Sequence, residues 1–346
     1  MAEKGGGLPR RMLRPLAALP LLVLLAGACT HTPDTSLHPQ PPAVRYAPLQ
    51  HPFRGARLLV DPGTEAARWQ RQHGARWLDP ITTRPQAHWL TSPQDLAEVP
   101  ALARRARSQH ALLLLVAYYV PNRGCTGFRQ GAPSGADYAG WTDQLVHDLG
   151  PTRAVVVMEP DAVPGDCFDA GRAAALRRAV RRLAAAGQYV YVDAGHTRWR
   201  STGEVAQRLL QAGIQYAQGF AVNVSNRQTT GDSYRWGREL SDLLGSREFV
   251  IDTSRNGIGP PPDQPGKGDE WCNPEHQALG QPPTTATAAP GLGALLWIKP
   301  PGESDGLCGG EHTYFFSPTQ ARRLIANSPW VPPSSRRLAL QVPTPA

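Results

Sequence analysis

The sequence lacks an apolar run long enough to cross a membrane. Its most apolar stretch, residues 16–25, covers ten positions, whereas a helix that spans the lipid core needs about 20. Arg10, Arg11 and Arg14 precede this stretch and the small residues Ala26, Gly27 and Ala28 follow it. A basic segment, a short apolar run and small residues are typical of an export signal, so we predict that residues 1–28 are a signal peptide.

Two processing routes fit this signal, and the sequence leaves both open. The Ala26-Gly27-Ala28 triplet suits cleavage by an ordinary signal peptidase. Residues 25–29 also resemble a lipoprotein box, in which Cys29 carries the lipid. We therefore expect a bacterial protein that is secreted or lipid-anchored at the outer cell surface, with membrane contact only through Cys29.

The sequence also lacks a strong excess of charge. Its 36 basic and 28 acidic residues give a formal charge of +8, which falls to +5 without the four basic and one acidic residues of positions 1–28. The arginines are scattered through helical segments such as 177–182, which is typical of solvated helix faces. We expect no nucleic-acid partner.

Cysteine is scarce as well. Setting Cys29 aside leaves four cysteines, which allow three pairings. No two of them have the spacing of a zinc knuckle, so we expect no metal and no cofactor. Export favours disulfides, and among the three pairings we favour Cys125–Cys167 with Cys272–Cys308.

No internal repeat and no second module is visible, so we expect one domain. We also expect a monomer. Residues 29–48 are rich in proline and threonine and are predicted to be a linker. Residues 49–331 are predicted to form one folded domain, and residues 332–346, with four prolines, a loose tail.

Within the domain, apolar runs alternate with helical patterns. Continuous Val, Leu and Ile runs, each followed by a helix, indicate buried parallel strands. We therefore predict an α/β fold, a distorted or incomplete parallel (β/α) barrel. The predicted strands are 57–61, 86–90, 112–119, 155–159, 189–193, 220–224, 249–252 and 294–298. The predicted helices are 63–74, 93–108, 137–149, 169–186, 201–212, 233–244 and 317–327.

Polar residues cluster where these strands end. One aspartate after a strand is commonly a helix N-cap, but several on successive strands favour a shared site at the carboxyl edge of the sheet. The residues in question are Asp161, Asp193, Asn223, Asn226, Asp252, Arg255 and Asp305.

Six segments occur in an order that resembles glycoside hydrolase family 6, the endo-β-1,4-glucanases and cellobiohydrolases. They are residues 157–161, 191–196, 223–226, 251–257, 271–274 and 299–306. The resemblance covers roughly residues 51–330. It implies an incomplete α/β barrel, hydrolysis of a β-1,4-glucan with inversion, and no metal. Inversion uses one protonated carboxyl group and one carboxylate that activates water.

The resemblance assigns the general acid to Asp161 and the base to Asp305. The apolar run before Asp161 favours partial burial, which raises the pKa of a carboxyl group. Asp305 has an alternative role, to hold an arginine such as Arg255. Asp193 matches a third carboxylate near the reacting sugar.

Further residues match positions that bind the sugar. Aromatic rings stack on the apolar faces of sugars and polar groups bond their hydroxyls. The matching aromatics are Trp89, Tyr118, Trp199 and Trp271, and the matching polar residues are His196, Asn223, Lys299 and Glu303. Trp297, inside an apolar strand, is expected in the core.

The chain departs from the family beside the predicted acid. Where the family has Arg-Asp-Cys, this chain has Arg123, Gly124 and Cys125. Gly124 cannot assist the acid, and Arg129 lies near the position of a water-holding serine. We considered Asp166 as a replacement carboxylate. A lost electrostatic stabiliser costs roughly 10²–10³-fold in rate, so we predict a slow enzyme or a shifted pH optimum.

Three functions remain open. The first is an endo-acting glucanase, because only two residues separate Asp305 from Cys308, too few for the long loop of the tunnel-forming exo enzymes. The second is a β-glucan-binding protein whose catalysis was lost with the change to Gly124. The third is an enzyme that acts on a surface glycan made by its own cell.

Overall fold

The computed structural model describes residues 50–125, 130–262, 272–313 and 315–341. The predicted signal peptide, Cys29, Arg129 and Trp271 lie outside these ranges, as does the whole predicted linker.

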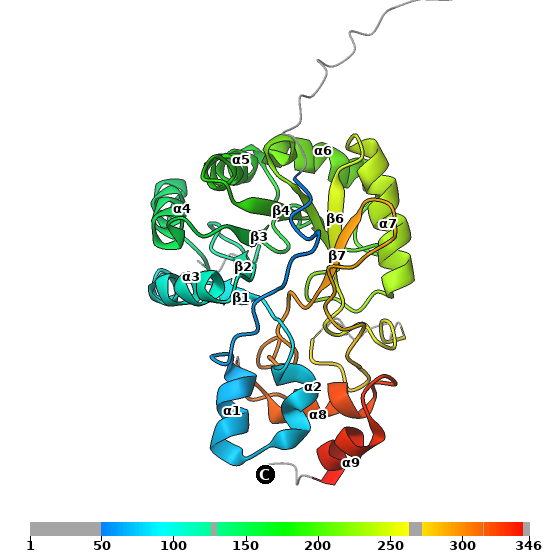
Figure 1. Ribbon diagram of the computed structural model, residues 1–346. Coiled ribbons are helices and arrows are strands. Elements are labelled where there is room, and N and C mark those ends of the chain that lie inside the picture. Colours follow the sequence, from blue (N-terminus) through cyan, green and yellow to red (C-terminus); the bar gives the residue numbers. More distant parts are fainter. Residues whose placement is uncertain (1–49, 126–129, 263–271, 314, 342–346) are drawn as a thin grey trace, which may run out of the picture. The chain divides into compact units, whose positions relative to one another are not determined.

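A single sheet of seven parallel strands organises the described chain (Figure 1). The strands lie in the sheet in the order in which they occur in the sequence, so each connection returns the chain to the neighbouring position. Each strand lies within two residues of its predicted bounds. The strands are β1 His88–Leu90, β2 Leu113–Ala117, β3 Ala154–Met158, β4 Tyr189–Asp193, β5 Gly219–Val222, β6 Glu248–Asp252 and β7 Leu292–Leu296.

Both faces of the sheet are buried, which explains the continuous apolar runs. Along β3, Val156 and Met158 pack toward the helices, whereas Val155 and Val157 pack into the interior of the curled sheet with Tyr191. Successive side chains of a strand point to opposite faces. A polar residue at any of these positions would therefore be buried on one face or the other.

The sheet curls until its two edges meet without forming a ladder. The backbone N–H of Ala87, just before β1, donates to the carbonyl of Trp297, just after β7, at 3.0 Å. The indole Nε1 of Trp89 donates to the carbonyl of Ile298 at 2.8 Å. The barrel is therefore incomplete, as predicted.

The predicted first strand, residues 57–61, is absent as a strand. Leu58 alone bridges Leu112 in parallel orientation, because Pro62 and Gly63 turn the chain into α1 directly afterwards. The described residues thus contain seven of the eight predicted strands.

Five helices follow one another around the outer face of the sheet (Figure 1). Four begin at a side-chain N-cap, Ser134, Asp169, Ser201 or Thr229, whose oxygen accepts from a backbone N–H of the first turn. The helices are α3 Val99–Ser108, α4 Gly135–Leu149, α5 Ala170–Ala185, α6 Thr202–Ala212 and α7 Thr230–Leu243. The 3₁₀ turns η2 Gln94–Glu98 and η3 Ile214–Tyr216 lie between elements.

The remaining helices form a third apolar cluster around Trp297, which lies in the core as predicted. They are α1 Glu65–His73, α2 Asp79–Thr82, α8 Pro318–Ala326 and α9 Pro333–Gln341, with the 3₁₀ turn η1 Arg76–Leu78. Helix α9 corrects the prediction of a loose tail over residues 332–346. A proline in the first turn is compatible with a helix, and Ala339 is fully buried against this cluster.

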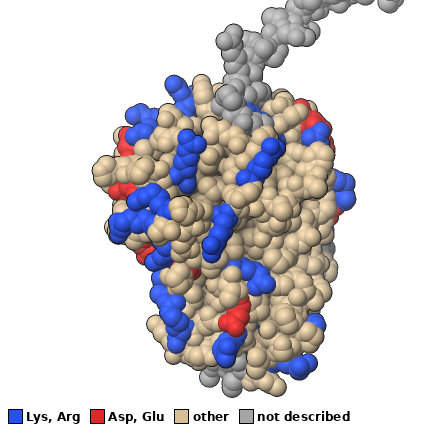
Figure 2. Space-filling model, viewed as in Figure 1, with Lys and Arg blue, Asp and Glu red and all other residues tan. Residues whose placement is uncertain are grey.

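Basic side chains are spread over the surface. On the face shown in Figure 2 they lie among uncharged residues, with few acidic ones. Among the described residues, no helix is both long and apolar enough to cross a membrane.

Candidate active site

The carboxyl ends of the strands bring most of the predicted site residues to one edge of the sheet. Asp193 and Asp252 are the last residues of β4 and β6, and Asp161 follows β3 by three residues. Lys299 and Asp305 follow β7. Because all seven strands are parallel, these ends share one edge, as the sequence predicted.

Asp161 occupies a strained and polarised position. Its backbone has a φ of 70°, in the left-handed region that non-glycine residues rarely adopt. Its backbone N–H donates to Asp193 Oδ2 at 2.9 Å, while its own carboxyl group has no hydrogen-bond partner among the described residues. Burial, and then the negative charge of Asp305, raise the pKa of Asp161 to about 6. Such a group keeps its proton in weakly acidic solution.

Asp193 accepts the hydrogen bond from the Asp161 backbone and is only 1% exposed. Burial raises the pKa of Asp193 well above its ordinary value, and the neighbouring Asp161 adds to this effect. The hydrogen bond from the Asp161 backbone fixes the loop that carries the predicted acid. Asp193 is thus the carboxyl group that the structure places directly against Asp161.

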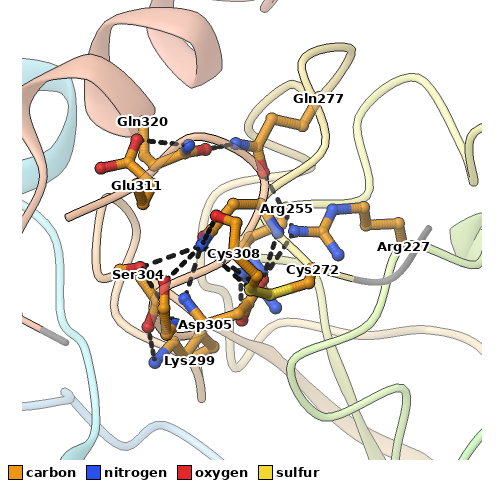
Figure 3. Close-up of a disulfide and its surroundings, with 12 residues drawn as sticks. Arg227, Arg255, Cys272, Gln277, Lys299, Ser304, Asp305, Cys308, Glu311 and Gln320 are labelled. Carbon is orange, nitrogen blue, oxygen red and sulfur yellow. Dashed lines mark hydrogen bonds and ion pairs between the residues drawn. A yellow bond between two sulfur atoms is a disulfide. The ribbon is translucent and has the colours of Figure 1, made fainter. Parts of the chain in front are cut away.

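Asp305 has the opposite electrostatic environment (Figure 3). Arg255 Nη1 lies 2.8 Å from its Oδ1 and Arg227 Nη2 lies 3.2 Å from its Oδ2. Burial alone would raise the pKa of Asp305, but Arg255, Arg227 and Lys299 outweigh it and hold that pKa well below its ordinary range. The predicted alternative, that Asp305 holds Arg255, is therefore correct in geometry. This ion pair is compatible with a catalytic role, because the two arginines keep the Asp305 carboxylate ionised.

Asn273 fixes the backbone on both sides of Asp305. Its side-chain Oδ1 accepts from the Asp305 backbone N–H at 2.9 Å, and its own backbone N–H donates to Asp305 Oδ2 at 3.1 Å. Its Nδ2 lies 3.0 Å from Ser304 Oγ and 3.1 Å from the Cys308 carbonyl. The Cys272–Cys308 disulfide closes the same loop (Figure 3).

Both predicted disulfides are confirmed. The Cα atoms lie 5.4 Å apart in Cys125–Cys167 and 6.0 Å apart in Cys272–Cys308, within the range that a disulfide spans. The first ties the loop that follows β2 to the segment before α5, and the second ties the loop of Asn273 to that of Asp305. Each therefore braces one of the two predicted catalytic loops.

Four predicted sugar-binding residues lie together at the β1 end of the site. The rings of Trp89 and Tyr118 meet edge to face with centroids 5.2 Å apart. Lys299 Nζ lies 5.3 Å from the centre of the Trp89 ring and 3.4 Å from Glu303 Oε2. This group combines an apolar ring face with charged hydrogen-bonding groups, as sugar recognition requires.

His196 and Trp199 lie on the loop that follows β4. Their rings are 5.5 Å apart, and Trp199 is 37% exposed. Burial, and then Arg198, lower the pKa of His196 to about 4. The imidazole is therefore neutral at the pH where Asp161 still carries a proton, so it can both donate and accept a hydrogen bond.

Asn223 departs from its predicted role. It is fully buried; its Nδ2 donates to the carbonyl of Asp252 at 2.9 Å and its Oδ1 accepts from the backbone of Gln228 at 3.0 Å. With both ends of its amide used by protein, Asn223 positions the loop after β5 and does not bind a sugar hydroxyl. Its backbone φ of 67° lies in the left-handed region.

Asp166 is also not the replacement carboxylate that the sequence suggested. Its side chain is 91% exposed and pairs with Arg200. The backbone N–H of Gly165 donates to the carbonyl of Asp161, which closes a turn over residues 161–165. Asp166 follows this turn and faces solvent.

Sequence reasoning missed two residues that organise the site. Arg227 is 3% exposed and is the second cation on Asp305. Its Nη2 also contacts Gln277 Oε1 at 3.2 Å, four residues after Asn273. Glu159 is fully buried, accepts from the backbones of Tyr119 and Val120 at 3.0 Å, and joins the ends of β2 and β3. The position of Arg227 directly after Asn226, at a strand end, was the available signal.

Across the described ranges, no group of three or more His, Cys, Asp or Glu residues is arranged to hold a metal ion. Two of the predicted site positions, Trp271 and the water-binding position near Arg129, lie outside these ranges.

Residues 57–329 match the model of the family described as glycosyl hydrolases family 6, and the chain belongs to this family. The match covers most of the described domain, including every strand of the sheet. The family that the six motifs predicted is therefore confirmed.

Individual relatives agree with this assignment. Endoglucanase A of Cellulomonas fimi is 41% identical over 73% of this chain and 57% of its own length, so the chain spans little more than half of that relative. Endoglucanase 1 of Streptomyces sp. is 39% identical over 70% of each protein. The endoglucanase Cel6 of Mycobacterium tuberculosis, solved in complex with a thio-linked methyl-cellobiosyl-cellobioside, superposes with a TM-score of 0.75 and 38% identity, covering 80% of this chain and 99% of that one.

Proposed function

We propose that this chain hydrolyses internal β-1,4-glucosidic bonds of a cellulose-like glucan with inversion at the anomeric carbon. The observation that carries the proposal is that the surroundings of two carboxyl groups shift their pKa values in opposite directions. Burial raises the pKa of Asp161 to about 6, and two arginines hold the pKa of Asp305 far below that. One protonated and one ionised carboxyl group is the pair that inverting hydrolysis requires.

In this mechanism, Asp161 donates its proton to the oxygen of the departing glucosyl unit. Its carboxyl group has no protein partner among the described residues, so it is available to that oxygen. Asp305 accepts the proton of the attacking water on the opposite face of the sugar. Arg255 and Arg227 make Asp305 a weak base, and they also hold it in one orientation.

We propose that catalysis is slower than in relatives that carry the additional aspartate. Gly124 offers no carboxylate, and Asp166 points away and pairs with Arg200. Asp193 is the remaining carboxyl group in contact with the Asp161 loop. The alternative function, a β-glucan-binding protein with little or no catalysis, is supported by the same absence of a side chain at Gly124.

Viscometry of a soluble β-1,4-glucan tests the proposal directly. We expect a fast fall in viscosity with few new reducing ends, and products that first appear as the α-anomer by NMR. Initial formation of the β-anomer would contradict inversion. Binding of the glucan without any cleavage would favour the alternative function.

The pH dependence follows from the same two groups. Asp161 must carry its proton, so kcat/KM is expected to be constant below about pH 6 and to fall about tenfold per pH unit above it. Asp305 stays ionised throughout this range, so no acidic limb from Asp305 is expected near neutrality. Rates measured from pH 4 to 9 on one soluble glucan check this. A rate that increases up to pH 9 would contradict the acid role of Asp161.

We also propose that the chain is exported and works outside the cytoplasm, with lipid at Cys29 as one route of attachment. Two disulfides brace the catalytic loops, and disulfides persist in oxidising compartments.

A further inference from the structure

A chain of side-chain hydrogen bonds leads from a partly exposed carboxylate to Asp305 (Figure 3). Arg227 Nη2 donates to Asp305 Oδ2 and to Gln277 Oε1, at 3.2 Å in both cases. Gln277 Nε2 donates to Gln320 Oε1, and Gln320 Nε2 donates to Glu311 Oε1 at 2.6 Å. Gln277 and Gln320 are buried, whereas Glu311 is partly exposed. The mechanism proposed above assigns no role to these last three residues.

The chain joins segments that lie far apart in the sequence. Arg227 is in the loop between β5 and α7, and Gln277 is in the segment before β7. Gln320 is in the first turn of α8, where its backbone N–H donates to the N-cap Ser317 at 3.2 Å. Helix α8, which belongs to the third apolar cluster, is thereby connected to the loop of the proposed base.

The two ends of the chain fix the direction of every hydrogen bond in it. An ionised carboxylate only accepts and a guanidinium only donates, whereas an amide does both. Glu311 therefore requires the Nε2 of Gln320, which leaves the Oε1 of Gln320 for Gln277. Gln277 must then donate with its own Nε2, so its Oε1 faces Arg227. The charge of Glu311 thus determines that Arg227 meets an oxygen and not an NH₂ group.

Arg227 depends on that oxygen because its guanidinium is buried, with a side chain only 3% exposed. Burial, and then the neighbouring Arg255, lower the pKa of Arg227 to about 9, although Asp305 opposes this effect. A buried charged donor without an acceptor is costly. Nη2 carries two hydrogens, one for Asp305 and one for Gln277. An NH₂ group in place of the Gln277 oxygen would repel Arg227 and turn it away from Asp305.

We propose that Glu311, Gln320 and Gln277 are positioning residues for the proposed base. They hold Arg227 on Asp305 and so fix the orientation and the charged state of that carboxylate. The inference rests on the proposed function for the catalytic role of Asp305. Because the three residues act through Arg227 and not on the sugar, changing them is expected to alter kcat and to leave KM nearly constant.

Kinetics on a soluble β-1,4-glucan from pH 3 to 9 test the inference. Gln277→Met keeps an unbranched side chain of similar length but removes both amide hydrogen bonds. It is expected to lower kcat about tenfold at nearly constant KM, with an acidic limb that begins at a higher pH because Asp305 loses part of its cationic surroundings. Glu311→Gln is expected to lower kcat about threefold, because an amide can present either its oxygen or its nitrogen to Gln320.

A double-mutant cycle shows whether Gln277 acts through Arg227. Arg227→Met already lacks the guanidinium, so adding Gln277→Met to it is expected to change kcat by less than about twofold. Gln188→Met is the matched control for the loss of a buried amide. Gln188 accepts from the backbone of Ala154 at 2.7 Å and donates to the carbonyl of Thr152 at 3.1 Å, at the amino ends of the strands. It is expected to leave kcat and the pH profile unchanged.

Arginine side-chain ¹⁵N NMR tests the geometry without turnover. A guanidinium held by fixed acceptors rotates slowly and gives separate Nη signals, which Arg227→Met identifies by their loss. We expect Gln277→Met to merge the Arg227 signals. Unchanged signals would overturn the inference, and so would an unchanged kcat and pH profile or a loss of kcat that persists in Arg227→Met. Merged signals, with no hydrolysis by the unmodified protein, would uphold the positioning of Arg227 and refute the proposed function.

Discussion

Replacing Asp161 by asparagine is expected to lower kcat/KM on a soluble β-1,4-glucan about 10²–10⁴-fold, the usual contribution of a positioned general acid. Asparagine has nearly the same shape and keeps the loop that the backbone N–H of Asp161 forms with Asp193. It cannot donate a proton to the leaving oxygen. Removing this carboxyl group also relieves the repulsion with Asp305, so we expect no loss of folding stability.

Two comparisons identify the cause of the loss. An aryl cellobioside whose phenolate leaves without protonation is expected to be cleaved at nearly the unmodified rate by Asp161→Asn. Asp166→Asn, five residues further along and 91% exposed in its side chain, is expected to retain full activity on both substrates. Equal losses on the glucan and on the activated substrate would show that Asp161 positions the site and is not the acid.

Replacing Asp305 by alanine is expected to have two large effects. The base is lost, which we expect to lower kcat about 10²–10⁴-fold. Arg255 and Arg227, both about 3% exposed in their side chains, lose their carboxylate partner. Breaking a buried ion pair typically costs about 3–5 kcal/mol, so the free energy of unfolding is expected to fall by a similar amount in urea titrations.

Azide separates the two roles of Asp305. A small anion can occupy the space of the missing carboxylate and attack the sugar, so azide is expected to restore part of the rate of Asp305→Ala and to form a glycosyl azide. Asp143→Ala, which removes an exposed ion pair with Arg182, is the control for stability and is expected to cost at most about 1 kcal/mol. Lost stability with an unchanged kcat would show that Asp305 serves only to hold the arginines.

Apolar runs and short motifs in the sequence predicted most of the fold but only part of the site. The strands were predictable because their two faces are buried, which demands apolar residues at every position along a run such as 154–158. The strand at 57–61 was predicted from the same composition, yet Leu58 forms only one bridge. A strand forms only where a neighbouring strand pairs with it along its whole length, and the composition of a segment does not show whether such a neighbour is present.

For the site, the sequence placed Asp161, Asp193 and Asp305 at one edge of the sheet, and the structure agrees. It could not distinguish Asn223, which turns inward and is fully buried, from Lys299, which reaches the Trp89 ring. Both are polar residues that follow an apolar strand, Asn223 directly after β5 and Lys299 three residues after β7. The direction of a side chain in a loop depends on backbone dihedrals such as the φ of 67° at Asn223.

The sequence by itself determined the parallel α/β architecture, the family and the placement of Asp161 and Asp305 at one edge of the sheet, because apolar periodicity and short motifs are local properties. Only the tertiary structure decided that Arg227 joins Arg255 on Asp305 and that Asp166 faces away. These relations link residues on different strands and helices. They depend on how the sheet curls and how α6 and α7 pack, and no spacing along the chain encodes that geometry directly.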